Sequence, residues 1–164
     1  MDRYPVAGGG DPVGAEIERL TSLRDQLLDS ANRLNAMRHD GWSGAASDAS
    51  EAVRYAICRE FYRAADQHED AVRHLAEYNA VRQRVLSLTN EIRGEWPGGL
   101  PADAAGHVNW LWDQLAAAGR RAATGVRAAA AALGDVHRQL PEIRSTPVTA
   151  VRTARYRSLR RNWT

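Results

Sequence analysis

Apolar residues recur at steps of three and four along three long stretches of this chain, the spacing that places side chains on one face of an α-helix. In the first stretch they are Ile17, Leu20, Leu23, Leu27, Ala31, Leu34 and Met37. In the second the stripe is Ala49, Val53, Ile57, Phe61, Ala64, the polar His68, Val72 and Leu75, followed less regularly by Val81, Val85, Leu88 and Ile92. The third and most regular set is Val108, Leu111, Leu115, Ala118, Ala122, Val126, Ala129, Leu133, Val136 and Leu140. The pattern predicts three helices and no strands.

Capping residues indicate where the first helix begins and ends and where the second helix begins. Asp11 followed by Pro12 is typical of a helix start, because Asp can accept a hydrogen bond from an early amide and Pro fits the first helical position. Gly41 is a natural helix stop, and Ser43 is the expected N-cap of the second helix. The first connection is therefore expected to be short, with Trp42 inside it.

Glycine and proline mark the later boundaries. Gly94 and the break at 96–99 (Trp-Pro-Gly-Gly) are expected to end the second helix. The third helix should begin after Pro101, with Asp103 in its first turn. Two prolines, Pro141 and Pro147, are expected to bound its far end.

Helix lengths decide the predicted architecture. The first helix would be roughly 43 Å long and the second roughly 76 Å, so an antiparallel pair leaves about 30 Å of the second uncovered. The third helix, folding back, would cover that part and give an elongated up-down-up bundle. The predicted organisation is a flexible lead at 1–11, a helical hairpin at 12–94, a third helix at 95–141 and a basic tail at 142–164. Such a bundle is thin, and a second chain is a reasonable source of a fourth helical face.

Charge is distributed unevenly along the chain. All 22 basic residues are Arg; residues 1–100 carry 12 of them against 16 acidic residues, and residues 101–164 carry 10 against 4. The tail is the most basic part and contains Arg152, Arg155, Arg157, Arg160 and Arg161. It has Tyr156 and Trp163 interleaved, so it could bind nucleic acid, lie at an anionic membrane surface or remain a disordered soluble tail.

The sequence contains no motif typical of a catalytic, cofactor-binding or metal-binding site. Cys58 is the single cysteine, which excludes an internal disulfide framework, and no nucleophile has a base at motif spacing. Asp66, Asp70 and His74 recur every four residues, but the other helices offer no matching ligand pair, so a solvated face with a Glu69–Arg73 pair is the better interpretation. We expect no catalytic residues, no metal, no cofactor and no small-molecule substrate.

The N-terminal residues lack the apolar core of a signal peptide. The sequence also has no run of 18 apolar residues, which a membrane-spanning helix would need. Export, if it occurs, would need a route that recognises a folded feature.

Trp42 is the bulkiest residue of the first connection, and small residues follow it. Trp42-Ser43-Gly44 precedes Ala45-Ala46, so the start of the second helix is slim beside an indole. The indole either caps the core of the hairpin or lines a groove for a partner. This arrangement resembles the WXG superfamily of type VII secretion substrates, and the stretch from Gly10 to about Arg93 is similar to the N-terminal secretion-signal module of actinobacterial toxins.

The resemblance implies a fold and a role. Members are helical hairpins that pair as homodimers or heterodimers into four-helix bundles, are not enzymes, and are exported folded without a cleaved signal peptide. It implies an exported substrate, or a partner that presents a secretion signal for a larger effector to a secretion ATPase. Trp42 and Gly44 would shape the recognised tip. Localisation would be outside the cell, or cytoplasmic before export.

The export signal of the family is Tyr followed four residues later by Asp or Glu. Tyr62 and Asp66 fit this spelling, although they lie in the middle of the second helix instead of near the free end of the hairpin. The alternative is that they belong to an ordinary half-exposed helical face.

A second hypothesis needs no secretion. It is a cytoplasmic helical binding module whose Arg-rich tail engages nucleic acid or an anionic membrane, with Trp42 only structural.

Overall fold

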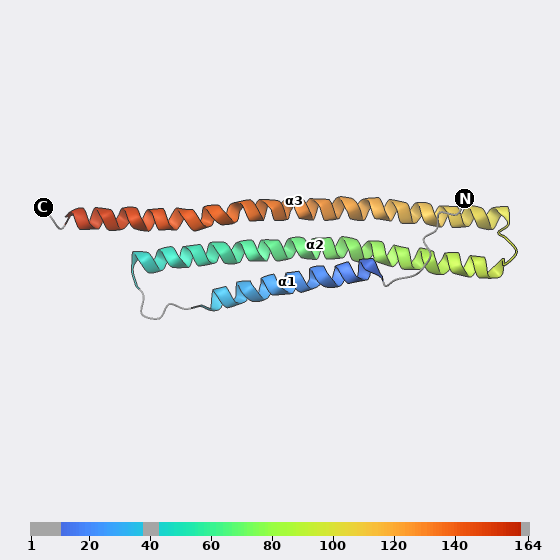
Figure 1. The fold of residues 1–164 in the computed structure, drawn as a ribbon, viewed down its shortest axis with the longest axis horizontal. Helices are drawn as coiled ribbons and strands as arrows, with labels where there is room; N and C mark the ends of the chain where they lie inside the picture. The colour runs from blue at the N-terminus through green and yellow to red at the C-terminus, as the bar shows by residue number, and fades with distance from the viewer. Residues whose placement is uncertain (1–10, 38–42, 162–164) are drawn as a thin grey trace.

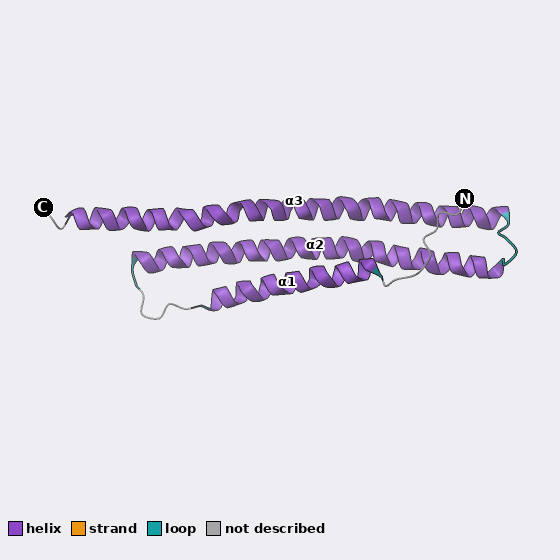
Figure 2. Cartoon of the chain, viewed as in Figure 1, coloured by secondary structure: helices purple, strands orange, loops and turns teal. Residues whose placement is uncertain are grey.

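The computed structural model describes residues 11–37 and 43–161, and from residue 140 onward it describes the backbone alone. Three helices, α1 (Pro12–Ala36), α2 (Ala45–Glu95) and α3 (Ala102–Arg161), account for nearly all of this part, which contains no strand (Figures 1 and 2). The prediction of an all-α protein is confirmed. The three helices lie side by side as a long rod in which α2 occupies the middle.

The start of α1 follows from Asp11, which is the N-cap residue as predicted. Its carboxylate accepts a hydrogen bond from the Val13 amide at 3.2 Å, and Pro12 follows at the first helical position. The same carboxylate binds Arg82 of α2 at 2.8 Å and Asn79 at 3.1 Å. Partial burial raises the pKa of Asp11, but these hydrogen bonds and the Arg82 charge outweigh it, so the pKa lies below its ordinary value. Asp11 therefore starts α1 and also attaches it to α2.

The first connection differs from the sequence prediction at both ends. α1 ends at Ala36 with Met37 as its C-cap, before Gly41, which lies outside the described residues. The carbonyl of Met37 accepts a hydrogen bond from the Arg54 guanidinium, which gives the helix end a partner that the sequence pattern did not reveal. Ser43 is not the N-cap of α2; that residue is Gly44, at φ 87° and ψ −170°, a region that only glycine adopts without strain.

The second connection matches its prediction. α2 ends at Glu95 with Trp96 as its C-cap, and Gly99, at φ 123°, takes the conformation that the turn requires. α3 then begins directly after Pro101, and Asp103 lies in its first turn.

The predicted end of the third helix is wrong. α3 continues through Pro141 and Pro147 to Arg161, so the segment expected to be a separate tail is helical in its backbone. Proline removes one backbone donor and costs about 3 kcal/mol inside a helix, which disfavours helix without forbidding it. Leu140, Glu142 and Arg144 are good helix formers beside Pro141 and favour continuation there, whereas the neighbours of Pro147 are Ser, Thr and Val and give no such support.

Two apolar clusters hold the helices together. The first contains Leu20 of α1, Ala71 of α2 and Ala129 of α3. The second lies where α1 does not reach and contains Val85 of α2 with Leu111 and Leu115 of α3. α3 thus packs on the part of α2 that extends beyond α1. The predicted apolar face of α3 is the best confirmed, because most of it is buried: Val108, Leu111, Leu115, Ala118, Ala122, Ala129 and Val136.

Glycines on α3 let rings from α2 approach its backbone. A Cβ atom added to Gly125 would lie 2.2–2.5 Å from three ring atoms of His74, whereas one added to Gly119 would meet Tyr78 only at 3.5 Å. The His74 ring therefore occupies the space that a side chain at Gly125 would need.

Gly125→Ala should destabilise the protein although alanine is the better helix former. The methyl group forces the His74 ring to move, and overpacking of this kind costs about 1–3 kcal/mol. Gly106→Ala is the matched control, since that glycine is on the same helix, is exposed and has nothing within 4 Å of the new Cβ; it should gain about 1 kcal/mol. Thermal unfolding followed by circular dichroism checks both, and a rise in Tm for Gly125→Ala would contradict the packing described.

Candidate partner-binding surface

The four residues that the sequence proposed for partner binding are not gathered at one place among the described residues. Trp42 lies outside that part of the chain, so its position is not described. Gly44 is the exposed N-cap of α2, whereas Tyr62 and Asp66 lie more than four turns further along the same helix. Gly44 and the Tyr62–Asp66 pair are therefore separate features.

Tyr62 participates in the contact between α1 and α2. Its hydroxyl donates to the side-chain oxygen of Asn32 at 2.8 Å, and its side chain is 37% exposed. Asp66, one turn further along, is exposed and has no hydrogen bond or ion pair to any described residue. Tyr62 thus has a structural role in the hairpin, which is independent of any role in export.

Several polar contacts hold α1 and α2 in an antiparallel register. Asp11 with Arg82 lies at one end, Arg24 with Glu69 lies in the middle, and the Met37 carbonyl with Arg54 lies at the other end. The thiol of Cys58, the buried single cysteine, donates to the Ala31 carbonyl at 3.5 Å. The predicted pair of Glu69 with Arg73 is not formed, because Glu69 binds Arg24 of α1 and Arg73 binds Asp70 at 2.7 Å.

Sequence reasoning missed Glu60, the largest fully buried side chain among the described residues. Its carboxylate accepts from Arg63 at 2.8 Å and from Arg59 at 3.1 Å, and Arg63 also donates to Gln139 of α3 at 2.8 Å. The charge is buried but paired on both oxygens, which is the condition for tolerating it inside a protein. The spacing of Glu60 and Arg63 was the available signal, but it indicates only a local pair.

The residues considered for a metal site are separated by the structure. His74 packs against Gly125 of α3, and Asp70 is bound to Arg73. Nowhere in the described part do three or more His, Cys, Asp or Glu side chains converge as metal ligands would.

The tryptophans 110 and 112 differ as their helical positions require: Trp110 is 54% exposed and Trp112 packs against the second apolar cluster.

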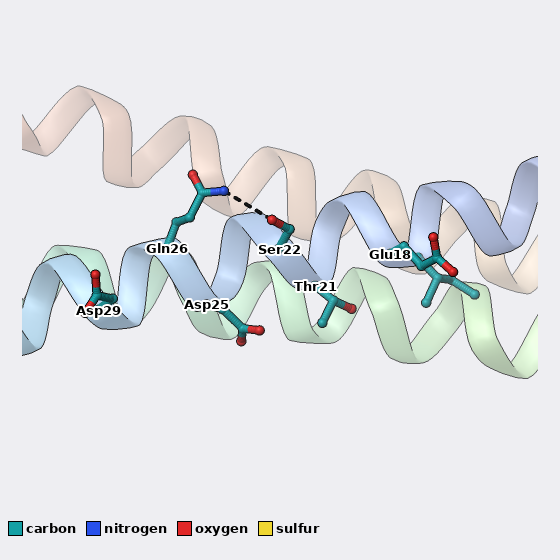
Figure 3. A pocket seen from close by; sticks show the side chains of 7 residues that line it. Glu18, Thr21, Ser22, Asp25, Gln26 and Asp29 are labelled. Atoms are coloured by element: carbon teal, nitrogen blue, oxygen red, sulfur yellow. Dashed lines mark hydrogen bonds between the residues drawn. The ribbon is translucent and has the colours of Figure 1, made fainter.

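A shallow hollow runs along the outer side of α1 (Figure 3). It is lined by Ile17, Glu18, Thr21, Ser22, Asp25, Gln26 and Asp29. Asp25 is already bound to Arg24 and Asp29 to Arg33, and Ser22 accepts from Gln26 at 3.1 Å. The hollow lies on a single helix and has few groups free to hold a ligand.

The more informative surface lies along α2, between its contact with α1 and its contact with α3. No described residue of α1 has its Cα within 8 Å of a Cα of α3, so the two outer helices do not close over α2. Val72 and Leu75 of α2 and Val126 of α3 pack on the first apolar cluster but are only partly buried. We call these three residues the open seam.

Most arginines of α1 and α2 are paired with carboxylates, whereas most of the described arginine side chains of α3 are not. Eight arginines of α1 and α2 are paired with carboxylates of this chain: Arg19, Arg24, Arg33, Arg54, Arg59, Arg63, Arg73 and Arg82. On α3, Arg138 pairs with Asp135, but Arg120, Arg121 and Arg127 are exposed and have no ion pair with a described residue. The side chains of the predicted tail set, Arg152, Arg155, Arg157, Arg160 and Arg161, lie outside the description.

Comparison with known proteins identifies no relative, since the chain matches no family model, no curated protein and no solved structure. Within the described part, each helix is too polar or too short in its apolar runs to cross a membrane.

Tyr62→Phe should destabilise the hairpin by about 0.5–1.5 kcal/mol, because it removes the hydrogen bond to Asn32. A double-mutant cycle with Asn32→Ala should show coupling of at least about 0.5 kcal/mol in denaturant unfolding. Tyr55→Phe is the control, since Tyr55 is 56% exposed and its ring contacts Arg54 without a hydrogen bond from its hydroxyl to a described residue. Equal effects at the two tyrosines, or additive changes in the cycle, would refute the structural role of Tyr62.

Proposed function

We propose that this chain is a non-enzymatic helical pairing protein of the type VII secretion pathway. It acts as an exported substrate, or as an adaptor that pairs with a larger effector and presents its secretion signal. The observation that supports pairing is the open seam, because its apolar side chains on α2 and α3 are only partly buried and could be covered by another chain.

The composition of the buried core supports pairing. Half of the buried apolar residues in the described part are alanines, including Ala31, Ala64 and Ala65. Larger side chains, such as Phe61, the only phenylalanine, and Leu75, remain half-buried. A helix laid over the seam would bury Leu75 further, and each additional CH₂ group removed from water contributes about 0.8 kcal/mol.

The pathway rests on the resemblance of Trp42-Ser43-Gly44 to the WXG motif. In this proposal α1 and α2 form the WXG-like hairpin, the connection containing Trp42 forms its tip, and α3 is a third helix that folds back in an up-down-up arrangement. Gly44 supports this interpretation, because its backbone conformation at the start of α2 requires glycine. The described part of this chain supplies three helices, so a four-helix bundle would include at least one helix of the partner.

The secretion signal in this proposal is Tyr62 with Asp66. The free carboxylate of Asp66 supports it, whereas the Tyr62 hydroxyl is already used by Asn32. Recognition would therefore read the ring of Tyr62 and the charge of Asp66 on the assembled hairpin. Export would need no cleaved signal peptide, and the secretion ATPase is the component expected to read the signal.

Val126→Thr tests the pairing surface. The chain is co-expressed with each small helical protein that its gene neighbourhood is found to encode, and one of them should form a stable one-to-one complex, measured by sedimentation. Val126→Thr keeps the shape of the side chain but puts a hydroxyl in the open seam, and we expect the dissociation constant to rise about tenfold, which corresponds to about 1.4 kcal/mol. Thr124→Val on the exposed face of the same helix is the control and should leave the complex unchanged.

The second arm of that experiment is Trp42→Ala, which should weaken the complex if the tip contributes to pairing. Failure to find any complex, including self-association, would remove the basis of the proposal. A complex that Val126→Thr and Thr124→Val weaken equally would place the interface elsewhere.

A second candidate function is binding of a polyanion such as nucleic acid. The observation that favours it is the set of unpaired arginines on α3, in contrast to α1 and α2, where most arginines are paired and Arg84 is an exception. Arg120 and Arg127 are seven residues apart, about 10 Å along one side of the helix, and small residues such as Thr124, Ala128 and Ala131 lie between and beyond them. An Arg-rich continuation of α3 to Arg161 would extend the same charge.

Replacing Arg120, Arg121 and Arg127 by Gln tests this candidate. Binding to duplex DNA should weaken, and the slope of log K against log salt should fall by about 2–3, roughly one for each phosphate that is no longer neutralised. Replacing Arg19, Arg33 and Arg73 by Gln changes the net charge equally but removes arginines that are already paired, so it should have a much smaller effect. Deletion of residues 145–164 tests the tail, and equal weakening in both triple variants would indicate net charge alone.

A further inference from the structure

The outer face of α3 is not covered by another helix in the described part of the chain. Its opposite face packs on α2 through the buried residues, and no described residue of α1 has its Cα within 8 Å of a Cα of α3. On the outer face, Trp110, Asp113, Ala117, Arg121 and Thr124 recur at steps of three, four, four and three, so they form one line along the helix. We call these five residues the outer stripe. All of them are exposed except Ala117, which is partly buried.

The charges of the outer stripe change sign at Ala117. Asp113 lies one turn before it, and Arg121, with its neighbour Arg120, lies one turn after it. None of these three charged side chains forms an ion pair with a described residue. A line that is acidic on one side of its midpoint and basic on the other is complementary to a copy of itself running in the opposite direction.

The apolar content of the outer stripe has the same symmetry. Trp110 is 54% exposed, and its ring centroid lies 5.6 Å from that of His107 on the same helix. Tryptophan is enriched among the residues that anchor protein interfaces. Thr124 lies as far after Ala117 as Trp110 lies before it, and its small side chain leaves room for an indole.

A two-fold axis at Ala117 brings each of these residues opposite its complement. In an antiparallel pair of α3 helices about this axis, residues equally far from Ala117 lie opposite one another. Asp113 of one copy then lies opposite Arg121 of the second copy and about 1.5 Å along the axis from Arg120, and symmetry forms the contact twice. Trp110 lies opposite Thr124. The two Ala117 residues meet at the centre, where their small side chains let the helices approach closely.

A polyanion accounts for the outer stripe less completely. Phosphates would bind Arg120 and Arg121, but the carboxylate of Asp113 in the same line would repel them. Phosphate contacts also give no role to the exposed indole of Trp110. A second copy of this chain uses the acid, the two arginines and the indole together.

We propose that two copies of this chain pair antiparallel through the outer stripe of α3, with Asp113 of each copy bound to Arg120 and Arg121 of the other. This pairing goes beyond the proposed function and does not depend on it, because Val126 of the open seam lies about 160° around α3 from Trp110. Different substitutions therefore test the two surfaces.

Charge reversal tests the pairing in sedimentation equilibrium of the full-length chain at low salt. Asp113→Arg places like charges opposite one another, and so does the double variant Arg120→Asp with Arg121→Asp, so each should raise the dimer dissociation constant at least about tenfold. Mixing the two variants makes both contacts attractive again, and a one-to-one heterodimer about as stable as the wild-type dimer should form. These positions are exposed, so the helix content measured by circular dichroism should not change.

Trp110→Ala should weaken the dimer to a similar extent, whereas Trp96→Ala, at an indole that is 48% exposed outside the outer stripe, should not. Small-angle X-ray scattering should show the longest dimension rising from roughly 90 Å in the monomer to roughly 130 Å in the dimer, because Ala117 lies near one end of α3. Three results would overturn the proposal: a wild-type chain that stays monomeric, with or without bound DNA; a mixture of the charge variants that does not associate; or a dimer that Val126→Thr dissociates while the outer-stripe variants do not.

Discussion

The close approach of α2 to two neighbours at once is the constraint on which the rest of the structure depends. α2 packs against α1 on one side and α3 on another, while α1 and α3 do not approach each other in the described part of the chain. Two interfaces on one helix leave room mainly for small residues, which explains the buried alanines and the glycine beneath the His74 ring. Small residues bury little apolar area, so each interface contributes less hydrophobic stabilisation than a leucine-rich one of the same length.

Polar contacts fix the alignment of each helix along its neighbour, which small apolar side chains cannot do. An alanine-rich interface permits sliding of one helix along another, because neighbouring registers bury similar areas. The contacts of Asp11 with Arg82, of Tyr62 with Asn32 and of Arg54 with the Met37 carbonyl fix one register for α1. Arg63, bound to Glu60 and Gln139, does the same between α2 and α3. Exposed pairs add little stability individually, but together they exclude alternative alignments.

The sequence was most informative where one physical rule acted alone. The spacing of apolar residues on α3 identified its buried face, and Asp11 with Pro12 identified the start of α1, because both depend only on local geometry. Prediction failed where distant groups contribute: the Arg54 contact at the end of α1 joins residues 17 apart, and the burial of Glu60 depends on its surroundings in the fold. Pro141 and Pro147 misled because a proline inside a helix carries a free-energy cost and is not an absolute barrier to helix.

The candidate surface was harder to predict than the fold. Trp42, Gly44, Tyr62 and Asp66 were identified by resemblance of motif, which says nothing about exposure or about hydrogen bonds such as the one from Tyr62 to Asn32. The open seam and the unpaired arginines of α3 are properties of how helices assemble, so they appear only when contacts across the bundle are known. They also differ in physical character. In the proposed roles the seam would take an apolar partner that excludes water, whereas the arginines would take an anionic partner that salt displaces, so the salt dependence of binding distinguishes the two.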